Sequence, residues 1–181
     1  MTTISASHPI TPDLAWSIYE SPLGPLTLTA GPQGLRRLDF PGQAAEVRED
    51  RRDDVLLDPV RRQLDEFFSG RRRSFDLHLD LGGTPFQRQV WALLEAIEFG
   101  ETRSYGELAR ALGRIDRVRA VGGAVGRTPV PIIVPCHRAV GADGSLTGYR
   151  GGLQRKRGLL DHEAAVCGGR WPSVGRSGGS A

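Results

Sequence analysis

With 181 residues, 39% of them hydrophobic and 25% charged, the chain has the size and composition of a globular protein of one domain or two small ones. It shows no apolar run long enough to cross a membrane and no secretory signal, so we expect no membrane partner and a cytoplasmic location. Its two cysteines, Cys136 and Cys167, are too few for a disulfide framework or a zinc site, which fits a reducing compartment.

The net charge of +3 is unevenly distributed along the chain. Residues 1–84 carry 10 basic and 13 acidic side chains, whereas residues 85–181 carry 14 basic and 8 acidic ones. Within residues 103–157 the basic side chains outnumber the acidic ones by 11 to 3. A composition rich in arginine is the alternative explanation, but it would not segregate the charges. The pattern therefore favours a nucleic-acid partner.

Residues 1–84 predict a small α+β domain. Strand-like runs at residues 16–19, 26–30 and 35–40 are separated by turn signals, which indicates a β-meander. The polar run at residues 43–54 is expected to form a solvated loop. No motif in this part can be tied to chemistry, so we expect it to act as a scaffold.

One helix and one further strand are predicted to complete this domain. Asp53 and Asp54 precede apolar residues at helical spacing, and Gly70 marks the end of the predicted helix. Apolar residues then alternate over residues 75–79, as they do in a strand. The chain divides near residues 82–84.

Two capping boxes predict helix starts in the second half. Thr84 and Gln87 flank a proline at the first helical position, and apolar residues follow at helical spacing up to Gly100. Ser104 and Glu107 form the second box, which opens a short helix. We expect the first of these helices to belong to the core.

The short helix is predicted to end at Gly113, and a third helix follows after a brief turn. Asp116 is placed to cap this third helix, which carries Val118, Val121 and Val125 on one face. Two short helices joined by a turn that contains glycine resemble a helix-turn-helix unit.

Gly122 and Gly123 lie inside the third helix, where each costs about 1 kcal/mol relative to alanine. Glycine allows a backbone to come close, either that of another protein element or that of DNA, and the sequence leaves both interpretations open. With Arg119 beside them, these small residues suit a shallow minor-groove contact better than base reading in the major groove.

Residues 128–138 place a thiol beside an imidazole. Prolines on both sides of an apolar triplet stiffen the backbone and hold Cys136 in a fixed place. A free cysteine has a pKa of about 8.5, so its thiolate needs a base or a positive environment, for which His137 and Arg138 are the local candidates. Adjacent side chains do not face each other, so His137 needs a tight turn or a bridging water, and a buried carboxylate to orient it. The alternative is a buried structural cysteine beside a core histidine.

The second half also contains several distinctive runs, of which Pro-Cys-His-Arg at residues 135–138 is the most specific. They are residues 119–124, 129–138, 148–153 and 159–163, with a further turn at residues 21–26. Together they resemble the O6-alkylguanine-DNA alkyltransferases, also called methylated-DNA–protein-cysteine methyltransferases. The resemblance extends over residues 85–164. It implies an RNase-H-like N-terminal domain and, over residues 85–167, a C-terminal helical domain with a winged-helix-like helix-turn-helix.

The resemblance implies that the partner is double-stranded DNA containing alkylated guanine. The alkylated nucleotide must be flipped from the minor groove into a pocket, because a fixed thiol cannot reach an alkyl group inside the duplex. Arg119 matches the arginine that enters the base stack, and Tyr105 the tyrosine that presses on the neighbouring phosphate. From the residues alone, Arg119 could be an ordinary phosphate contact and Tyr105 a core aromatic. The DNA-binding residues expected on this basis are Tyr105, Arg119, Ala120, Gly122, Gly123 and Thr128.

In the pocket, the resemblance makes Cys136 the acceptor of the alkyl group and guanine the leaving group. The Tyr149 hydroxyl would donate to a ring nitrogen, and the backbone amide of Arg150 to the oxygen. The carbonyl groups of Cys136 and Ala139 would accept from the exocyclic amine, and Pro131 would help to shape the pocket.

The resemblance also supplies the carboxylate that the thiol and imidazole need. His137 would deprotonate Cys136 through a water, oriented by Glu163, with His162 as the neighbouring alternative. A thioether has no easy route back to a thiol, so each molecule would act once, with no cofactor and no metal. A non-catalytic regulator or lesion-binding protein would not require these residues together, and a Cys-His hydrolase would turn over.

Two positions depart from the family's pattern. Thr128 stands where the family usually has an asparagine that ties the recognition helix to the active-site strand, and a hydroxyl replaces only part of an amide's bonding. We expect weaker coupling or a rearranged turn there. No cysteine precedes Cys136, so we expect none of the zinc that some members bind.

We also expect a monomer that can assemble cooperatively on DNA, and a disordered tail over residues 168–181.

Overall fold

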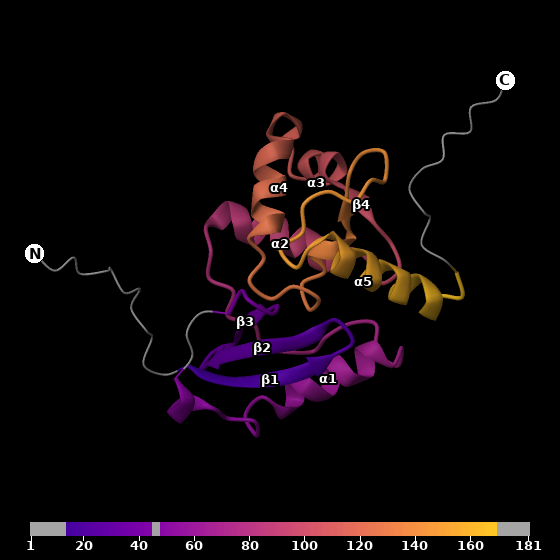
Figure 1. The fold of residues 1–181 in the computed structure, drawn as a ribbon. Helices are drawn as coiled ribbons and strands as arrows, with labels where there is room; N and C mark the ends of the chain where they lie inside the picture. Colours follow the sequence, from indigo (N-terminus) through magenta and orange to yellow (C-terminus); the bar gives the residue numbers. More distant parts are fainter. Residues whose placement is uncertain (1–13, 45–47, 170–181) are drawn as a thin grey trace, which may run out of the picture.

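The structure is a computed structural model that describes residues 14–44 and 48–169. An antiparallel sheet with one α-helix forms the N-terminal part, and a group of helices forms the C-terminal part, which stacks on the first (Figure 1). This arrangement confirms the predicted α+β class. Most of the tail predicted over residues 168–181 lies outside the described residues.

The sheet confirms the predicted β-meander. Its strands pair antiparallel in chain order, and tight turns connect them. One helix, α1 (Asp58–Phe68), contributes the fully buried Leu64 and Phe67 to the same hydrophobic core as the strands. The strands are β1 (Ala15–Ser21), β2 (Gly24–Gly31) and β3 (Gly34–Asp39).

The strand predicted over residues 75–79 is wrong. This segment makes one isolated parallel bridge to the start of β3, between Leu79 and Leu35. The backbone of Leu35 bonds to both His78 and Asp80, at 2.8 and 2.9 Å, and these are its contacts to the sheet backbone. Alternating apolar residues bury one face of an extended segment whether or not a ladder forms, so the pattern alone cannot distinguish the two.

Both predicted capping boxes in the C-terminal part are confirmed. Thr84 and Gln87 exchange hydrogen bonds of 3.2 and 2.8 Å, and Ser104 and Glu107 exchange bonds of 3.1 and 2.7 Å. The first helix ends at Glu95, earlier than the predicted end at Gly100. The elements are α2 (Pro85–Glu95), β4 (Arg103–Ser104), α3 (Tyr105–Ala111), α4 (Val118–Gly126), β5 (Ala139–Val140) and α5 (Leu153–Val166).

Helices α3 and α4 form the predicted helix-turn-helix, but Asp116 does not cap α4. A single 3-10 turn, η2 (Ile115–Arg117), precedes the helix, so Arg117 occupies the N-cap position and makes no side-chain cap bond. Asp116 therefore lies one residue too early to cap the helix. The unit is fixed to α2, where the indole Nε1 of Trp91 donates to the carbonyl of Ala124 at 3.0 Å.

Residues 129–138 lie between the two parts of the molecule. The backbone amide of Leu38 in β3 donates to the carbonyl of Pro129 at 3.0 Å. Ile132 has a φ of 76°, a left-handed conformation that costs a β-branched residue about 1–3 kcal/mol and persists here within a fully buried environment. A 3-10 turn, η3 (Cys136–Arg138), ends the run. The stiff segment predicted from its prolines is thus held by packing on all sides.

Candidate active site

The thiol of Cys136 is buried and protonated at rest. Cys136 begins η3 and is only 4% exposed. Burial raises the pKa of its thiol to about 11, while the Thr128 and Tyr149 hydroxyls and the Lys156 ammonium beside it act in the opposite direction. A nucleophilic role therefore requires a base that takes the thiol proton.

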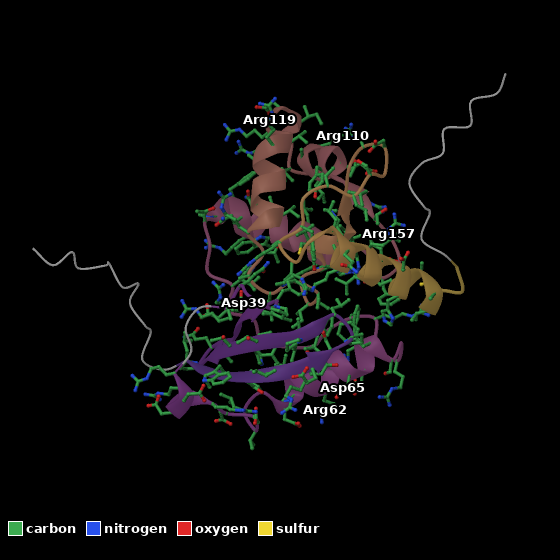
Figure 2. The ribbon with its side chains drawn as sticks, viewed as in Figure 1. Asp39, Arg62, Asp65, Arg110, Arg119 and Arg157 are labelled. Carbon is green, nitrogen blue, oxygen red and sulfur yellow. The ribbon has the colours of Figure 1, made fainter. Side chains whose placement is uncertain are left out.

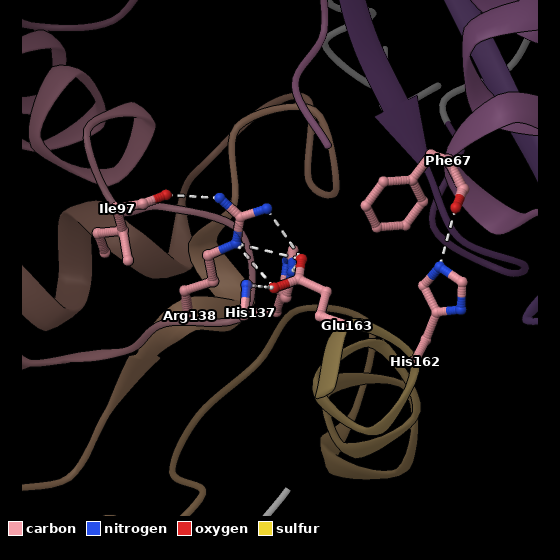
Figure 3. Close-up of polar contacts among 7 residues, drawn as sticks. Phe67, Ile97, His137, Arg138, His162 and Glu163 are labelled. Atoms are coloured by element: carbon pink, nitrogen blue, oxygen red, sulfur yellow. Dashed lines mark hydrogen bonds and ion pairs between the residues drawn. The ribbon is translucent and has the colours of Figure 1, made fainter. Parts of the chain in front are cut away.

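His137, the next residue, is placed to act as this base. Its Nε2 lies 2.8 Å from Oε1 of Glu163, and neither side chain is exposed (Figure 3). Burial lowers the pKa of His137, so its imidazole is neutral at neutral pH. A carboxylate only accepts hydrogen bonds, so Nε2 carries the proton and Nδ1 is the basic nitrogen. Nδ1 is buried and has no hydrogen-bond partner within the described residues.

Arg138 holds the carboxylate of Glu163 in place, a contact that the sequence did not predict. Its guanidinium donates to Glu163 through Nε at 3.1 Å and Nη2 at 2.9 Å, and through Nη1 to the carbonyl of Ile97 at 2.6 Å. The backbone amide of Gly100 donates to Oε2 at 2.9 Å. Burial alone would raise the pKa of Glu163, but the hydrogen bond from His137 and the bonds and charge of Arg138 outweigh it and lower the pKa to about 2.

Acid is expected to destabilise the protein through these two groups. The lowered pKa of His137 makes its contribution complete above its ordinary value of 6.5 and lost below it. The stabilisation from Glu163 is complete above its ordinary pKa of 4.5 and is lost as the pH falls to about 2. At about 1.4 kcal/mol per pKa unit, the Glu163 contribution is on the order of 3 kcal/mol. Denaturant unfolding between pH 8 and pH 2 measures this loss, and a constant stability over that range would contradict it.

Lys156 carries a second buried charge, which was not predicted from the sequence. Its Nζ donates to the carbonyls of Ala139 at 2.6 Å and Thr147 at 2.9 Å, and lies 3.4 Å from the Tyr105 hydroxyl. Burial lowers its pKa to about 8. A signal was present, because the only lysine of the chain shares one helical face with Leu159 and Glu163.

Two of the predicted pocket residues lie at the Cys136 turn, and a third is buried in the run before it. The Tyr149 hydroxyl lies beside Cys136 but makes no full hydrogen bond within the described residues, and burial raises its pKa well above 10. Ala139 is fully buried, and Pro131 is buried in the bridge that it forms with Val134. The structure therefore brings Tyr149 and Ala139 together with the Cys136 turn.

The predicted DNA-binding residues lie mostly on one outer face of the helix-turn-helix. Arg119 and Ala120 are exposed on the first turn of α4, and Arg119 lies at the end of the molecule away from the sheet (Figure 2). Tyr105, the first residue of α3, is half-buried, with its hydroxyl 3.2 Å from the carbonyl of Thr147. It is thus neither a free surface residue nor a full core aromatic.

Gly122 and Gly123 of α4 are not required by packing within the protein. A Cβ at Gly122 would lie 3.9 Å from the nearest atom, in the Tyr105 ring, and one at Gly123 would meet only the flexible Arg127 side chain, at 3.2 Å. Among the described residues no backbone approaches either glycine. Of the two interpretations left open by the sequence, the structure therefore favours an approach from outside the protein.

Thr128 is not at the DNA-binding surface where the sequence placed it, and His162 has a partner other than His137. Thr128 is 2% exposed and its hydroxyl donates to the carbonyl of Val125 at 2.8 Å, so it closes the end of α4 and cannot contact DNA directly. It still links the recognition helix to the active site, because it also lies beside the Cys136 thiol. His162, the alternative to Glu163, bonds instead to the carbonyl of Phe67 at 2.9 Å (Figure 3).

Within residues 14–44 and 48–169, no group of three or more histidine, cysteine, aspartate or glutamate side chains is arranged to hold a metal ion. Over the same residues, no helix has the length and apolar character needed to cross a membrane.

Comparisons with known proteins identify the family of this chain. Residues 85–165 match the 6-O-methylguanine DNA methyltransferase family in its DNA binding domain, and residues 14–81 match the ribonuclease-like domain of the same family. The methylated-DNA–protein-cysteine methyltransferase of Mycobacterium bovis is 47% identical over 146 residues, which are 80% of this chain and 88% of the relative. That of Methanosarcina acetivorans is 41% identical over 153 residues, with 83% and 98% covered.

Solved structures give the same result. The structure of Mycobacterium tuberculosis OGT in complex with DNA matches with a TM-score of 0.78 and 45% identity, and the match covers 84% of this chain and 94% of that chain. The Mycobacterium tuberculosis O6-methylguanine methyltransferase matches with a TM-score of 0.77 and 43% identity, over 88% and 96%. These similarities confirm the predicted resemblance over both parts of the molecule. The chain belongs to the 6-O-methylguanine DNA methyltransferase family, whose curated members carry the name methylated-DNA–protein-cysteine methyltransferase.

Proposed function

We propose that this protein repairs DNA by moving an alkyl group from O6 of guanine to Cys136, once per molecule. The observation that carries the proposal is the buried arrangement of Cys136, His137 and Glu163 in the domain that also holds the helix-turn-helix. A regulator or a lesion-binding protein without chemistry would need the helices but not a buried imidazole–carboxylate pair beside a thiol.

The thiol proton passes to Nδ1 of His137 through a bridging water, while Glu163 stabilises the imidazolium that forms. The sulfur of Cys136 then forms a bond to the alkyl carbon as the bond between that carbon and the guanine oxygen breaks. The electron pair of the broken bond stays on guanine, which takes up one proton. The net change is a thioether in place of the thiol and an unmodified guanine in the DNA.

Groups around the pocket stabilise the departing guanine. The Tyr149 hydroxyl donates to a ring nitrogen, and the backbone amide of Arg150 donates to the oxygen as charge develops on it. The carbonyl oxygen of Ala139 has two lone pairs, so it can accept from the exocyclic amine while it keeps its bond to Lys156.

DNA binds across α3 and α4 in this proposal. The arginines of this unit are exposed to solvent, where they can contact phosphates. Gly122 and Gly123 of α4 leave room for the backbone of the minor groove. Arg119 fills the space that the flipped nucleotide leaves, and Tyr105 presses on the phosphate beside it. The exposed basic side chains of the two helices and the turn are Arg110, Arg114, Arg117, Arg119 and Arg127.

Replacement of Arg119 by alanine is expected to slow transfer from duplex DNA by about ten- to a hundredfold, because flipping costs a few kcal/mol and Arg119 offsets part of it. Transfer from the free base O6-benzylguanine needs no flipping and should stay within about twofold of wild type. Single-turnover rates with both substrates measure the difference. Equal losses on both substrates would mean that Arg119 supports the fold instead of the flipping step.

The stoichiometry of transfer tests the overall proposal. Excess duplex DNA carrying radiolabelled O6-methylguanine should leave at most one methyl group on each protein molecule, with no further repair after that. Continued repair beyond one equivalent would contradict it and favour a hydrolase.

Further proposals concern the roles of the two domains, the location of the protein and its oligomeric state. We propose that residues 1–84 act as the scaffold, that residues 85–167 carry the chemistry, and that the protein acts in the cytoplasm. A monomer that assembles on DNA cooperatively stays a prediction, which sedimentation with and without DNA would measure.

A further inference from the structure

A buried carboxylate of the N-terminal sheet reaches the loop that forms one wall of the pocket. Asp39 ends β3 and is 2% exposed. The guanidinium of Arg37 donates two hydrogen bonds to the Asp39 carboxylate, of 2.9 Å from Nε and 2.7 Å from Nη2. The Arg150 side chain donates to Oδ1 of the same carboxylate, the oxygen that also accepts from Nη2 of Arg37. Asp39 thereby connects the sheet to Arg150, the residue next to Tyr149.

Two further contacts from the same end of the sheet hold this loop. The side-chain amide of Gln43 donates to the carbonyl of Arg150. The ring of Phe40 packs edge-on against the ring of Tyr149, with centroids 5.8 Å apart and an interplanar angle of 61°. A Cβ at Gly151 would lie 2.6 Å from the Phe40 ring, so only glycine allows this approach.

The loop has few other restraints among the described residues. Gly148 and Gly152 flank it with φ values of 35° and 85°, and a Cβ at either glycine would have no neighbouring atom within 4 Å. The segment between them forms no helix or strand. Arg155 also restrains the loop, because its guanidinium donates to the carbonyls of Gly151 and Leu23, both at 2.9 Å. The position of the loop is therefore set largely by the N-terminal part.

From this geometry we infer that Asp39 is a positioning residue for alkyl transfer: by holding the Arg150 side chain it fixes the backbone amide of residue 150 and the Tyr149 hydroxyl against the reacting guanine. The inference rests on the proposed function, in which these two groups stabilise the leaving guanine. Such donors act only when they are preorganised, and a displacement of about 1 Å can cost up to a hundredfold in rate. The N-terminal part thus acts on the reaction through the position of this loop, which gives its role as a scaffold a specific content.

A double-mutant cycle tests this inference with Asp39→Asn and Arg150→Gln in the full chain. Neither substitution removes the backbone amide of residue 150. Each is expected to lower the single-turnover rate at saturating O6-methylguanine duplex about tenfold, and the double variant should be no slower than either alone, because both break the same contact. The dissociation constant for unmodified duplex should stay within about twofold. Arg150→Lys keeps one charged donor and should recover most of the rate.

The matched control is Asp80→Asn, which breaks another ion pair of β3, the 3.7 Å contact with Arg36, away from the loop. It should transfer at the wild-type rate. Lower melting temperatures with unchanged saturating rates would make Asp39 purely structural and overturn the inference. Rate losses that add up in the double variant would overturn the inference. It would also be overturned if Arg150→Gln bound DNA more weakly while Asp39→Asn transferred at the wild-type rate, because Arg150 would then be a phosphate contact. Failure of the wild-type protein to accept any methyl group would instead reject the proposed function.

Discussion

Replacement of Glu163 by glutamine is expected to lower the free energy of unfolding by about 3–5 kcal/mol and to slow alkyl transfer at least about a hundredfold. The Glu163 carboxylate accepts from His137, from Arg138 and from the Gly100 amide, and all three groups are donors. Glutamine has the same shape, but its NH2 group must face one of these donors. It also leaves the buried guanidinium of Arg138 without a counter-charge.

The transfer rate falls because His137 becomes positively charged when it takes the thiol proton. The Glu163 carboxylate, 2.8 Å away and shielded from water, stabilises this charge. Denaturant unfolding and single-turnover transfer on one sample measure both effects. Asp161→Asn, an exposed carboxylate on the same helix, is the control and should resemble wild type. Wild-type stability and rate in Glu163→Gln would show that the carboxylate supports neither the core nor the base.

Replacement of Cys136 by alanine is expected to abolish alkyl transfer and to leave DNA binding almost unchanged. Once it has lost its proton, the Cys136 thiolate is the strongest nucleophile in the proposed site. It is 4% exposed and lies beneath the helix-turn-helix, so the affinity for unmodified duplex should stay within about twofold. The change removes one buried sulfur, and the cost in stability should be about 1 kcal/mol.

The second cysteine of the chain provides the control for this experiment. Cys167 is a free, exposed thiol that follows α5. Cys167→Ala should transfer at the wild-type rate, which separates the chemistry of the site from general thiol reactivity. Residual transfer in Cys136→Ala, or its loss in Cys167→Ala, would place the acceptor elsewhere.

Local signals predicted the fold well, and signals that need a distant partner did not. The capping boxes at Thr84 and Ser104 consist of residues three apart, so the sequence contains the whole interaction. The strand predicted over residues 75–79 needed a neighbouring ladder, and Asp116 needed the chain to enter α4 without an intervening turn. Neither condition can be read from local composition.

The candidate site divides in the same way. The residues alone identified Cys136 and His137 and required a carboxylate, but only the family resemblance named Glu163. Arg138 and Lys156 were missed as partners because their contacts, with Glu163 and Ala139, join segments separated by 25 and 17 positions in the chain. Burial of a charge, the feature that marks both, becomes visible only in three dimensions.

The central claim is that Cys136 accepts the alkyl group, and mass spectrometry of the reacted protein tests it most directly. The protein is mixed with duplex DNA that carries O6-methylguanine, digested, and its peptides are compared with those from a reaction on unmodified duplex. The account predicts one added methyl group on the peptide that contains Cys136, and none on the peptide that contains Cys167. A Cys136 peptide without the methyl group, while the lesion disappears from the DNA, would contradict it.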